Sequence, residues 1–159
     1  MKREKYEFFH NNYPKEVEEV EEKFEENPNL FETFYDADLL KEMSGGDELL
    51  EKLCEDVIEN AYRYAEILFE FNFLISGNPN DREEAQKWSH LDTTRKVCHD
   101  ALIDSIAIFS RNLEQKGRDN SIFKKLGSKE NRVAYGNFAL GLTYKELLKE
   151  EIKNDNGNG

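Results

Sequence analysis

Three residues that could do chemistry lie at helical spacing in the middle of the chain: Asp92, Arg95 and His99. Separations of three and four residues place them on one side of a helix, where their side chains can reach one another. A guanidinium can hold a phosphate or an oxyanion, an imidazole can transfer a proton near neutral pH, and a carboxylate can orient either group. Together these groups suit phosphodiester chemistry without a metal ion.

A purely structural role explains the same three residues. A buried arginine needs a carboxylate partner, and its remaining N–H donors seek carbonyl oxygens. Such a network can fix the register of a helical bundle without catalysing a reaction. The sequence leaves both interpretations open, and it favours the structural network over the catalytic site.

The three polar residues belong to a longer helical stripe. From Trp88 to Leu113 the stripe advances in alternating steps of four and three, which is the a/d pattern of a helix with one packed side. Its five large apolar members are Trp88, Leu102, Ile106, Phe109 and Leu113. A helix expected over residues 81–116 that buries this stripe must also bury the polar residues or hold them in a cleft.

A second helix with a matching stripe is expected over residues 48–75. Its stripe consists of Leu50, Leu53, Val57, Ala61, Tyr64, Leu68, Asn72 and Ile75. Because residues 76–79 (Ser-Gly-Asn-Pro) leave only a short link, the two helices must form an antiparallel hairpin. The polar residues of the second helix then lie against the Val57–Leu68 part of the first.

Shorter helices are expected around this hairpin. Asn12 and Pro14 mark a helix start, and apolar patterns predict further helices over 30–43, near 120–127, over 128–141 and from an N-cap at Thr143. No segment has a convincing strand pattern. We therefore predict an all-α protein: one helical domain over 1–153, built as a bundle on the long antiparallel hairpin with no sheet, and a disordered tail at 154–159.

The net charge of −12 is concentrated at the front of the chain. Residues 1–60 hold 19 acidic and 7 basic side chains, whereas residues 61–159 hold 15 of each. Seven of the eleven residues 16–26 are glutamates, including Glu18, Glu19, Glu21, Glu22, Glu25 and Glu26. A basic stretch lies at 111–132, with Arg111, Arg118, Lys124, Lys125, Lys129 and Arg132 among its members. An acidic protein repels nucleic acid at long range and attracts basic partners, although solubility alone also explains such a charge.

Several classes of protein are disfavoured by the sequence. No apolar run approaches the roughly 18 residues of a membrane helix, and the N-terminus lacks the apolar region of a signal peptide, so we expect a cytoplasmic protein without a membrane partner. Cys54 and Cys98 lie in helical apolar patterns without a CxxC motif, which predicts buried free thiols. Glu66 and Glu70 lie one turn apart, but no ExxH pattern accompanies them, so we expect no metal and no cofactor.

The run Arg95-Lys-Val-Cys-His99 within a helical hairpin resembles the Arg-x(4–6)-His motif of the HEPN superfamily. That superfamily consists of small helical-bundle proteins, many of them metal-independent RNases of toxin and defence systems, often dimeric. The resemblance covers residues 47–116, and three residues intervene in this chain where the motif has four to six. It implies that Arg95 contacts phosphate, that His99 acts on the attacking 2′-hydroxyl with Asp92 beside it, and that residues 111–132 form a basic lip.

Two functions follow as hypotheses. The first is a small acidic cytosolic interaction protein, an inhibitor or regulator of the kind found in phage and defence systems, and not an enzyme. It would dock on a protein partner, through the glutamates of residues 16–26, at a basic or nucleic-acid-binding surface. The alternative is a HEPN-like metal-independent endoribonuclease or a degenerate relative, and only this alternative makes RNA a ligand. The sequence leaves a homodimer open under either hypothesis.

Overall fold

The computed structural model of the chain describes residues 3–26, 36–75, 82–127 and 131–157. Every regular element within these residues is a helix, so the predicted all-α fold is confirmed. The helices are α1 (Arg3–Asn12), α2 (Pro14–Glu26), α3 (Ala37–Ser44), α4 (Glu48–Ile75), α5 (Arg82–Gln115), α6 (Ser121–Lys124) and α7 (Arg132–Gly157). None of the helices in the described part of the chain is long and apolar enough to cross a membrane.

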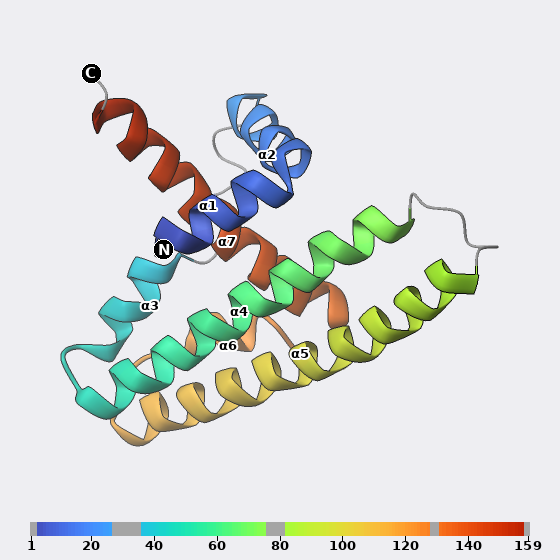
Figure 1. The fold of residues 1–159 in the computed structure, drawn as a ribbon. Helices are drawn as coiled ribbons and strands as arrows, with labels where there is room; N and C mark the ends of the chain where they lie inside the picture. The colour runs from blue at the N-terminus through green and yellow to red at the C-terminus, as the bar shows by residue number, and fades with distance from the viewer. Residues whose placement is uncertain (1–2, 27–35, 76–81, 128–130, 158–159) are drawn as a thin grey trace.

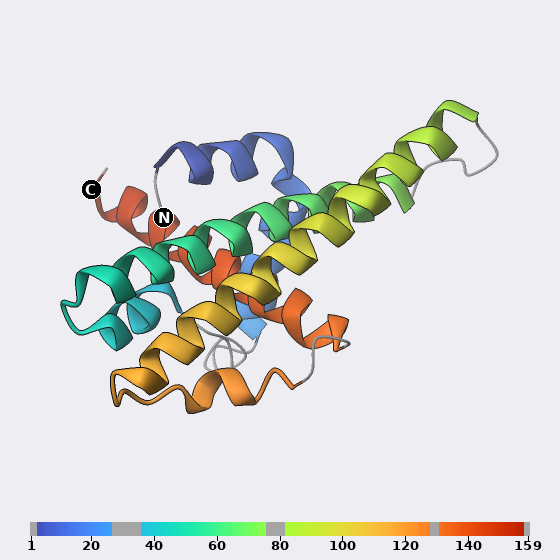
Figure 2. The same ribbon diagram turned by 90° about the horizontal axis from the view of Figure 1, so that it is seen from below.

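The predicted hairpin is the largest feature of the fold. α4 and α5 run antiparallel and lie side by side along most of their lengths (Figures 1 and 2). Their facing sides carry the apolar stripes that the sequence predicted. The residues buried there include Leu50, Val57, Ala61 and Tyr64 of α4 and Leu102, Ile106, Phe109 and Leu113 of α5.

Two of the remaining helices cover one face of the hairpin, and α1 and α3 lie on the α4 side of it. α6 and α7 lie behind α4 and α5 in Figure 1. α1 is anchored by aromatic packing, because the buried Phe9 ring meets Phe69 of α4 with ring centres 5.2 Å apart. Tyr13, at the junction of α1 and α2, stacks on the same cluster with its ring centre 5.3 Å from that of Phe69. These contacts hold the acidic helix α2 against the bundle.

The turn from α3 to α4 is tied to the end of α5. Gly45 ends α3 in the left-handed region (φ 56°), and the Asp47 carboxylate caps α4 by accepting from the Leu50 N–H at 3.0 Å. Lys116 binds the other Asp47 oxygen at 2.5 Å, and Arg118 Nε donates to the Met43 carbonyl at 2.6 Å. These contacts fix the direction in which α4 leaves the turn.

Two predicted helix boundaries differ from the structure. α3 begins at Ala37, where Asp36 caps it by accepting from the Asp38 N–H at 2.7 Å, while residues 30–35 of the predicted helix lie outside the described residues. The end of the chain forms one helix, α7, instead of the two predicted ones. Thr143 is not an N-cap: it is buried inside α7, and its hydroxyl donates to the Ala139 carbonyl at 2.8 Å. α7 also continues through 154–157, where the composition favoured a disordered tail.

Candidate functional site

The stripe of α5 becomes steadily more buried from its N-terminal to its C-terminal half. Trp88 is 46% exposed, the side chains of Asp92 and Arg95 are 19% and 21% exposed, and Leu102 is completely buried. The prediction that Trp88 belongs to the packed seam was therefore wrong. Figure 2 gives the reason, since the N-terminal part of α5 projects beyond α7, so that α7 does not cover it.

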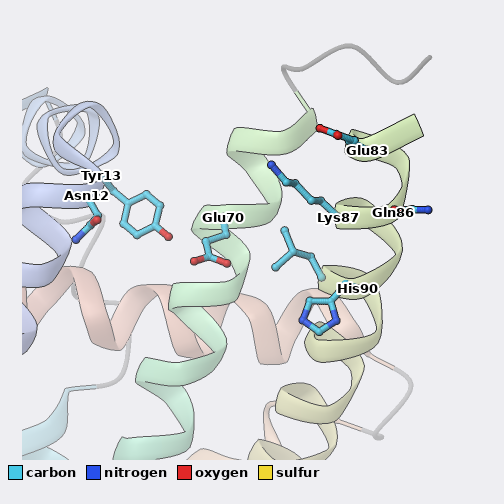
Figure 3. Close-up of a pocket in the computed structure, with 8 residues that line it drawn as sticks. Asn12, Tyr13, Glu70, Glu83, Gln86, Lys87 and His90 are labelled. Atoms are coloured by element: carbon cyan, nitrogen blue, oxygen red, sulfur yellow. The ribbon is translucent and has the colours of Figure 1, made fainter. Parts of the chain in front are cut away.

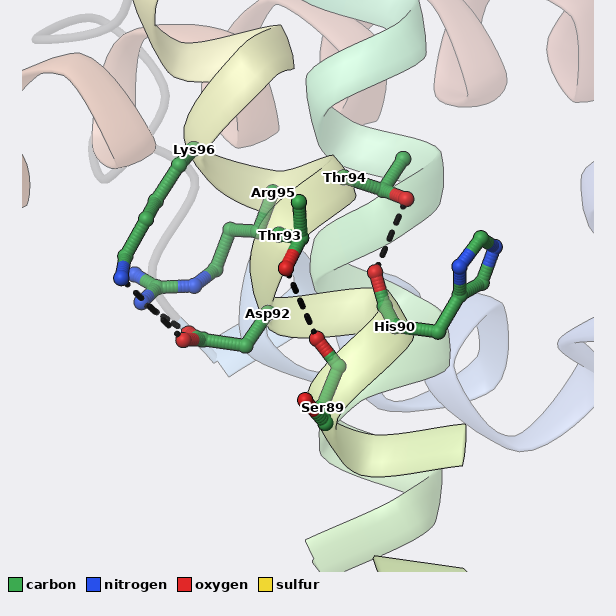
Figure 4. Close-up of polar contacts among 7 residues, drawn as sticks. All are labelled: Ser89, His90, Asp92, Thr93, Thr94, Arg95 and Lys96. Carbon is green, nitrogen blue, oxygen red and sulfur yellow. Dashed lines mark hydrogen bonds and ion pairs between the residues drawn. The ribbon is translucent and has the colours of Figure 1, made fainter. Parts of the chain in front are cut away.

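Asp92 and Arg95 form the contact that their spacing predicted. Arg95 Nη2 lies 2.6 Å from Asp92 Oδ1, and Lys96 Nζ lies 3.4 Å from Asp92 Oδ2 (Figure 4). The hydrogen bond from Arg95, aided by the Lys96 charge, holds the pKa of the Asp92 carboxyl below its ordinary value. The neighbouring Thr93 and Thr94 hydroxyls donate to carbonyls one turn back in α5, at 3.1 and 3.0 Å. The cluster is thus an ion pair at the helix surface with its acid kept charged.

His99 lies in a different environment from the ion pair. Its side chain is buried between Tyr64 of α4 and Tyr135 of α7, with ring centres 5.7 and 5.9 Å away and both contacts edge-on. His99 Nδ1 lies 3.5 Å from the exposed carboxylate of Asp100, while Nε2 is buried and has no hydrogen-bond partner among the described residues. His99 of α5 therefore lies where α4, α5 and α7 meet, and its ring packs against two tyrosine rings.

This geometry limits what His99 can do in a single chain. A general base must come within about 3 Å of the atom whose proton it removes, and the Tyr64 and Tyr135 rings both pack against the imidazole. Burial also raises the pKa of the Tyr135 phenol, which keeps that neighbour neutral. The arrangement in this state favours the structural interpretation of His99.

A cavity lies near the end of the hairpin where α4 ends and α5 begins, away from His99. It has a volume of about 810 Å³ and is lined by Asn12, Tyr13, Glu70, Glu83, Gln86, Lys87, His90 and Leu91. Figure 3 shows the Tyr13 hydroxyl and the Glu70 carboxylate pointing into this space from one side and Lys87 reaching across it from α5. A cavity of this size with both charge signs could hold a polar small molecule.

Sequence reasoning did not find this cavity, because its walls come from three separated segments. Among its lining residues, the sequence pointed to Glu70 only as a weak candidate metal ligand beside Glu66 and to Asn12 only as part of a helix start. Within the residues that the structure describes, no three histidine, cysteine or acidic side chains lie close enough together to hold a metal ion. Both cysteines are free; Cys54 is buried and Cys98 is half-buried, and burial raises both thiol pKa values.

The acidic surface that the sequence predicted is formed by α2. Its members with described side chains, Glu18, Glu19, Glu22, Glu25 and Glu26, are all exposed, and we call them the α2 acidic surface. The side chain of Glu21 lies outside the described residues. Val17, on the opposite side of α2, is buried. The helix therefore has one anchored side and one charged, solvated side.

The described residues of the predicted basic lip come from the end of α5, from α6 and from the segments that follow each of them. Arg111, Lys124 and Lys125 are exposed, whereas Arg118 is engaged with the α3–α4 turn. Lys129 and the side chain of Arg132 lie outside the described residues. Arg111 is twelve residues from His99 along α5, which corresponds to about 18 Å of helix.

Comparisons with protein-family models, curated proteins and solved structures find no match for this chain. The fold and its surfaces thus define the class: an all-α protein with an acidic N-terminal helix and an ion pair on its longest helix.

Proposed function

We propose that this protein is an interaction protein that docks on the basic surface of a macromolecular partner through the α2 acidic surface. The observation that carries the proposal is the set of five exposed glutamates on a helix whose opposite side is anchored by Tyr13 and Val17. Anchoring presents the charges in a fixed arrangement, so that a partner does not have to order the helix on binding. An inhibitor or regulator that covers a nucleic-acid-binding surface fits this design.

Electrostatics predicts how such docking depends on salt. Exposed charges steer association at low ionic strength and are screened beyond a Debye length of about 8 Å at physiological salt. Docking through the α2 acidic surface should therefore weaken steeply as salt rises, mainly through a slower association rate. A partner that binds equally well at low and high salt would contradict the proposal.

The decisive experiment separates the α2 acidic surface from the overall charge of the protein. The test variant combines Glu18→Lys, Glu19→Lys and Glu22→Lys on α2. The control combines Glu42→Lys, Glu55→Lys and Glu114→Lys, which replaces three exposed acids on other helices and gives the same net charge. Circular dichroism checks that both variants stay helical.

The wild-type protein and both variants are immobilised on resin. Each is then incubated with the same cell lysate, and the retained partners are compared. A partner retained by the wild type and the control but lost by the α2 variant supports the proposal. Equal retention by all three proteins, or equal loss from both variants, refutes it.

One observation favours a second candidate, the HEPN-like endoribonuclease. His99 Nε2 is buried without a hydrogen-bond partner in the described part of the chain, and such an atom costs about 1–3 kcal/mol, so its retention calls for a reason such as function. Catalysis would require the Tyr135 ring to move aside so that a 2′-hydroxyl reaches the imidazole, with Arg95 on the phosphate.

The test of this candidate is cleavage of single-stranded RNA in the presence of EDTA. His99→Ala should abolish cleavage, whereas His90→Ala, at an exposed histidine of the same helix, should not. Absence of cleavage by the wild type, or cleavage that survives His99→Ala, excludes this mechanism.

A further inference from the structure

The face of the hairpin opposite α7 carries a groove that no described helix covers. It lies between α4 and α5, which stand in front of α6 and α7 in Figure 1, and it has a volume of about 330 Å³. We call it the hairpin groove; its lining residues are Leu53, Asp56, Glu59, Asn60, Arg63, Ala101, Asp104, Ser105 and Ile108. A hydrogen bond from Asn60 Nδ2 to the Ala101 carbonyl, at 3.4 Å, joins its two walls.

Apolar side chains line part of this groove, and further exposed ones lie just beyond its two ends. Ile108 is 45% exposed, and Leu53 is half-buried. One turn beyond the lining residues, Leu49 of α4 is about half exposed and Val97 of α5 is 63% exposed. Leu49, Leu53 and Ile108 lie toward one end of the groove, and Ala101 and Val97 lie toward the other. The acidic and amide side chains of the lining lie between these two apolar patches. Exposed apolar patches beside polar residues are typical of interaction sites.

The charges on the rim select the kind of partner. The residues that line the groove include three acids, Asp56, Glu59 and Asp104, and one cation, Arg63. Arg63 Nε lies 3.8 Å from Glu59 Oε1, and both side chains of this pair are exposed. The whole chain carries a net charge of −12, so a second copy would be repelled, whereas a basic segment would be attracted. The rim charge and the net charge therefore both point to a basic ligand.

We propose that the hairpin groove binds a basic amphipathic helix of a partner protein. Because Asn60 meets Ala101 in this antiparallel pair, Leu53 and Ile108 lie at the same level, seven residues away along the hairpin. In a bound helix with apolar residues at i, i+4 and i+7, position i would lie over Leu53 and Ile108 and position i+7 over Ala101, and its lysines or arginines would meet the acidic rim. The groove extends over α4 residues 53–63, about 15 Å, which accommodates about three helical turns. This docking uses a surface separate from α2 and does not depend on the proposed role of the α2 acidic surface.

The probe is a synthetic peptide of about 14 residues with leucines at that spacing and lysines elsewhere. One control peptide carries glutamate in place of lysine, and another has the same composition in scrambled order. Each is titrated into the isotopically labelled full chain and followed by NMR shifts and fluorescence anisotropy. We expect shifts at Leu53, Ala101 and Ile108 with the ordered basic peptide, and weaker binding of both controls.

Two pairs of variants test the groove itself. Asp104→Lys should weaken peptide binding by about tenfold or more, whereas Glu114→Lys, the same charge change outside the groove on α5, should have little effect. Ile108→Ser should weaken binding too, whereas Val133→Ser, at an exposed apolar residue of α7, should not.

Four outcomes would overturn the proposal. The first three concern the peptide: a dissociation constant weaker than about 1 mM for the ordered peptide, equal binding of the scrambled peptide, or NMR shifts confined to α2. The fourth is self-association of the wild-type chain in sedimentation that Ile108→Ser abolishes, because a second copy would then cover the groove.

Discussion

Replacing His99 by phenylalanine tests whether this residue serves the fold or a reaction. The imidazole is buried edge-on between Tyr64 and Tyr135, and its Nε2 has no hydrogen-bond partner among the residues that the structure describes. A phenyl ring at this position can keep both edge-on contacts. The centre of the residue 99 ring lies 5.7 Å from that of Tyr64 and 5.9 Å from that of Tyr135, distances that suit aromatic pairs. The substitution therefore removes the unpaired polar atom and preserves the packing.

The expected magnitude follows from the balance of three terms. Relief of a buried unpaired polar atom gains about 1–3 kcal/mol. A swap between two planar rings of similar shape costs less than about 1.5 kcal/mol in a packed site. Loss of the 3.5 Å contact between His99 and the exposed Asp100 contributes little, because solvent screens it. We expect His99→Phe to be more stable than the wild type by about 1 kcal/mol, which raises Tm by about 2–4 °C in a chain of this size.

The assay is urea and thermal unfolding followed by circular dichroism at pH 8, where an unfolded-state histidine, with a pKa of about 6.5, is uncharged. His90→Phe is the matched control and should leave stability within about 0.5 kcal/mol, because His90 is exposed. If His99→Phe instead lowers stability by more than about 1 kcal/mol, the imidazole makes a polar contact on which the fold depends, and an unpaired Nε2 is ruled out.

Three further predictions concern other parts of the fold. The hydrogen bond from Lys116 lowers the pKa of Asp47, so the charged carboxylate stabilises the fold above the unfolded pKa of about 3.9 and this stabilisation is lost as pH falls through the lower folded value. Asp47→Asn, which can still cap α4, should therefore be less stable than the wild type at pH 7 and equal to it near pH 2; a constant difference in urea unfolding would contradict this. Burial raises the pKa of Cys54 to about 11, so a thiol reagent at pH 8 should modify the half-buried Cys98 first in the folded protein, and simultaneous labelling would count against the packing of α4. Phe69→Ala should cost about 3–5 kcal/mol and expose α1 and α2 to limited proteolysis, whereas unchanged stability would show that the aromatic cluster does not hold these helices.

The hairpin could be predicted from sequence because its signals are local. Apolar residues at steps of three and four define both helices, and the structure bounds them at Glu48–Ile75 and Arg82–Gln115, within a residue of expectation. The contact between Asp92 and Arg95 was predictable for the same reason, since its geometry depends only on the separation of two residues along one helix.

Features that depend on packing between distant segments were not predictable. Two glycines, Gly136 and Gly141, and a threonine at position 143, a residue type that often caps helices, are local cues for a break in the last helix. In the fold, however, the buried Phe138 and Leu142 pack α7 against the hairpin and override those cues. The contact between Tyr135 and His99 also depends on this packing. The sequence around Tyr135 does not indicate it, because the two rings meet only where α7 crosses α5.

The hairpin also shows why periodicity alone does not say which apolar residues a fold buries. The sequence placed Leu53 in the inner stripe of α4, yet Cys54 is the fully buried residue there, while Leu53 lines the outer groove. Both helices are apolar on more than one side, but α6 and α7 lie behind only one face of the pair. A stripe that folding does not use for burial stays available for a partner, and the carboxylates beside it select a basic one. Because the outer groove and the α2 acidic surface occupy different helices, Asp104→Lys and the α2 charge reversals can tell which of the two surfaces a given partner uses.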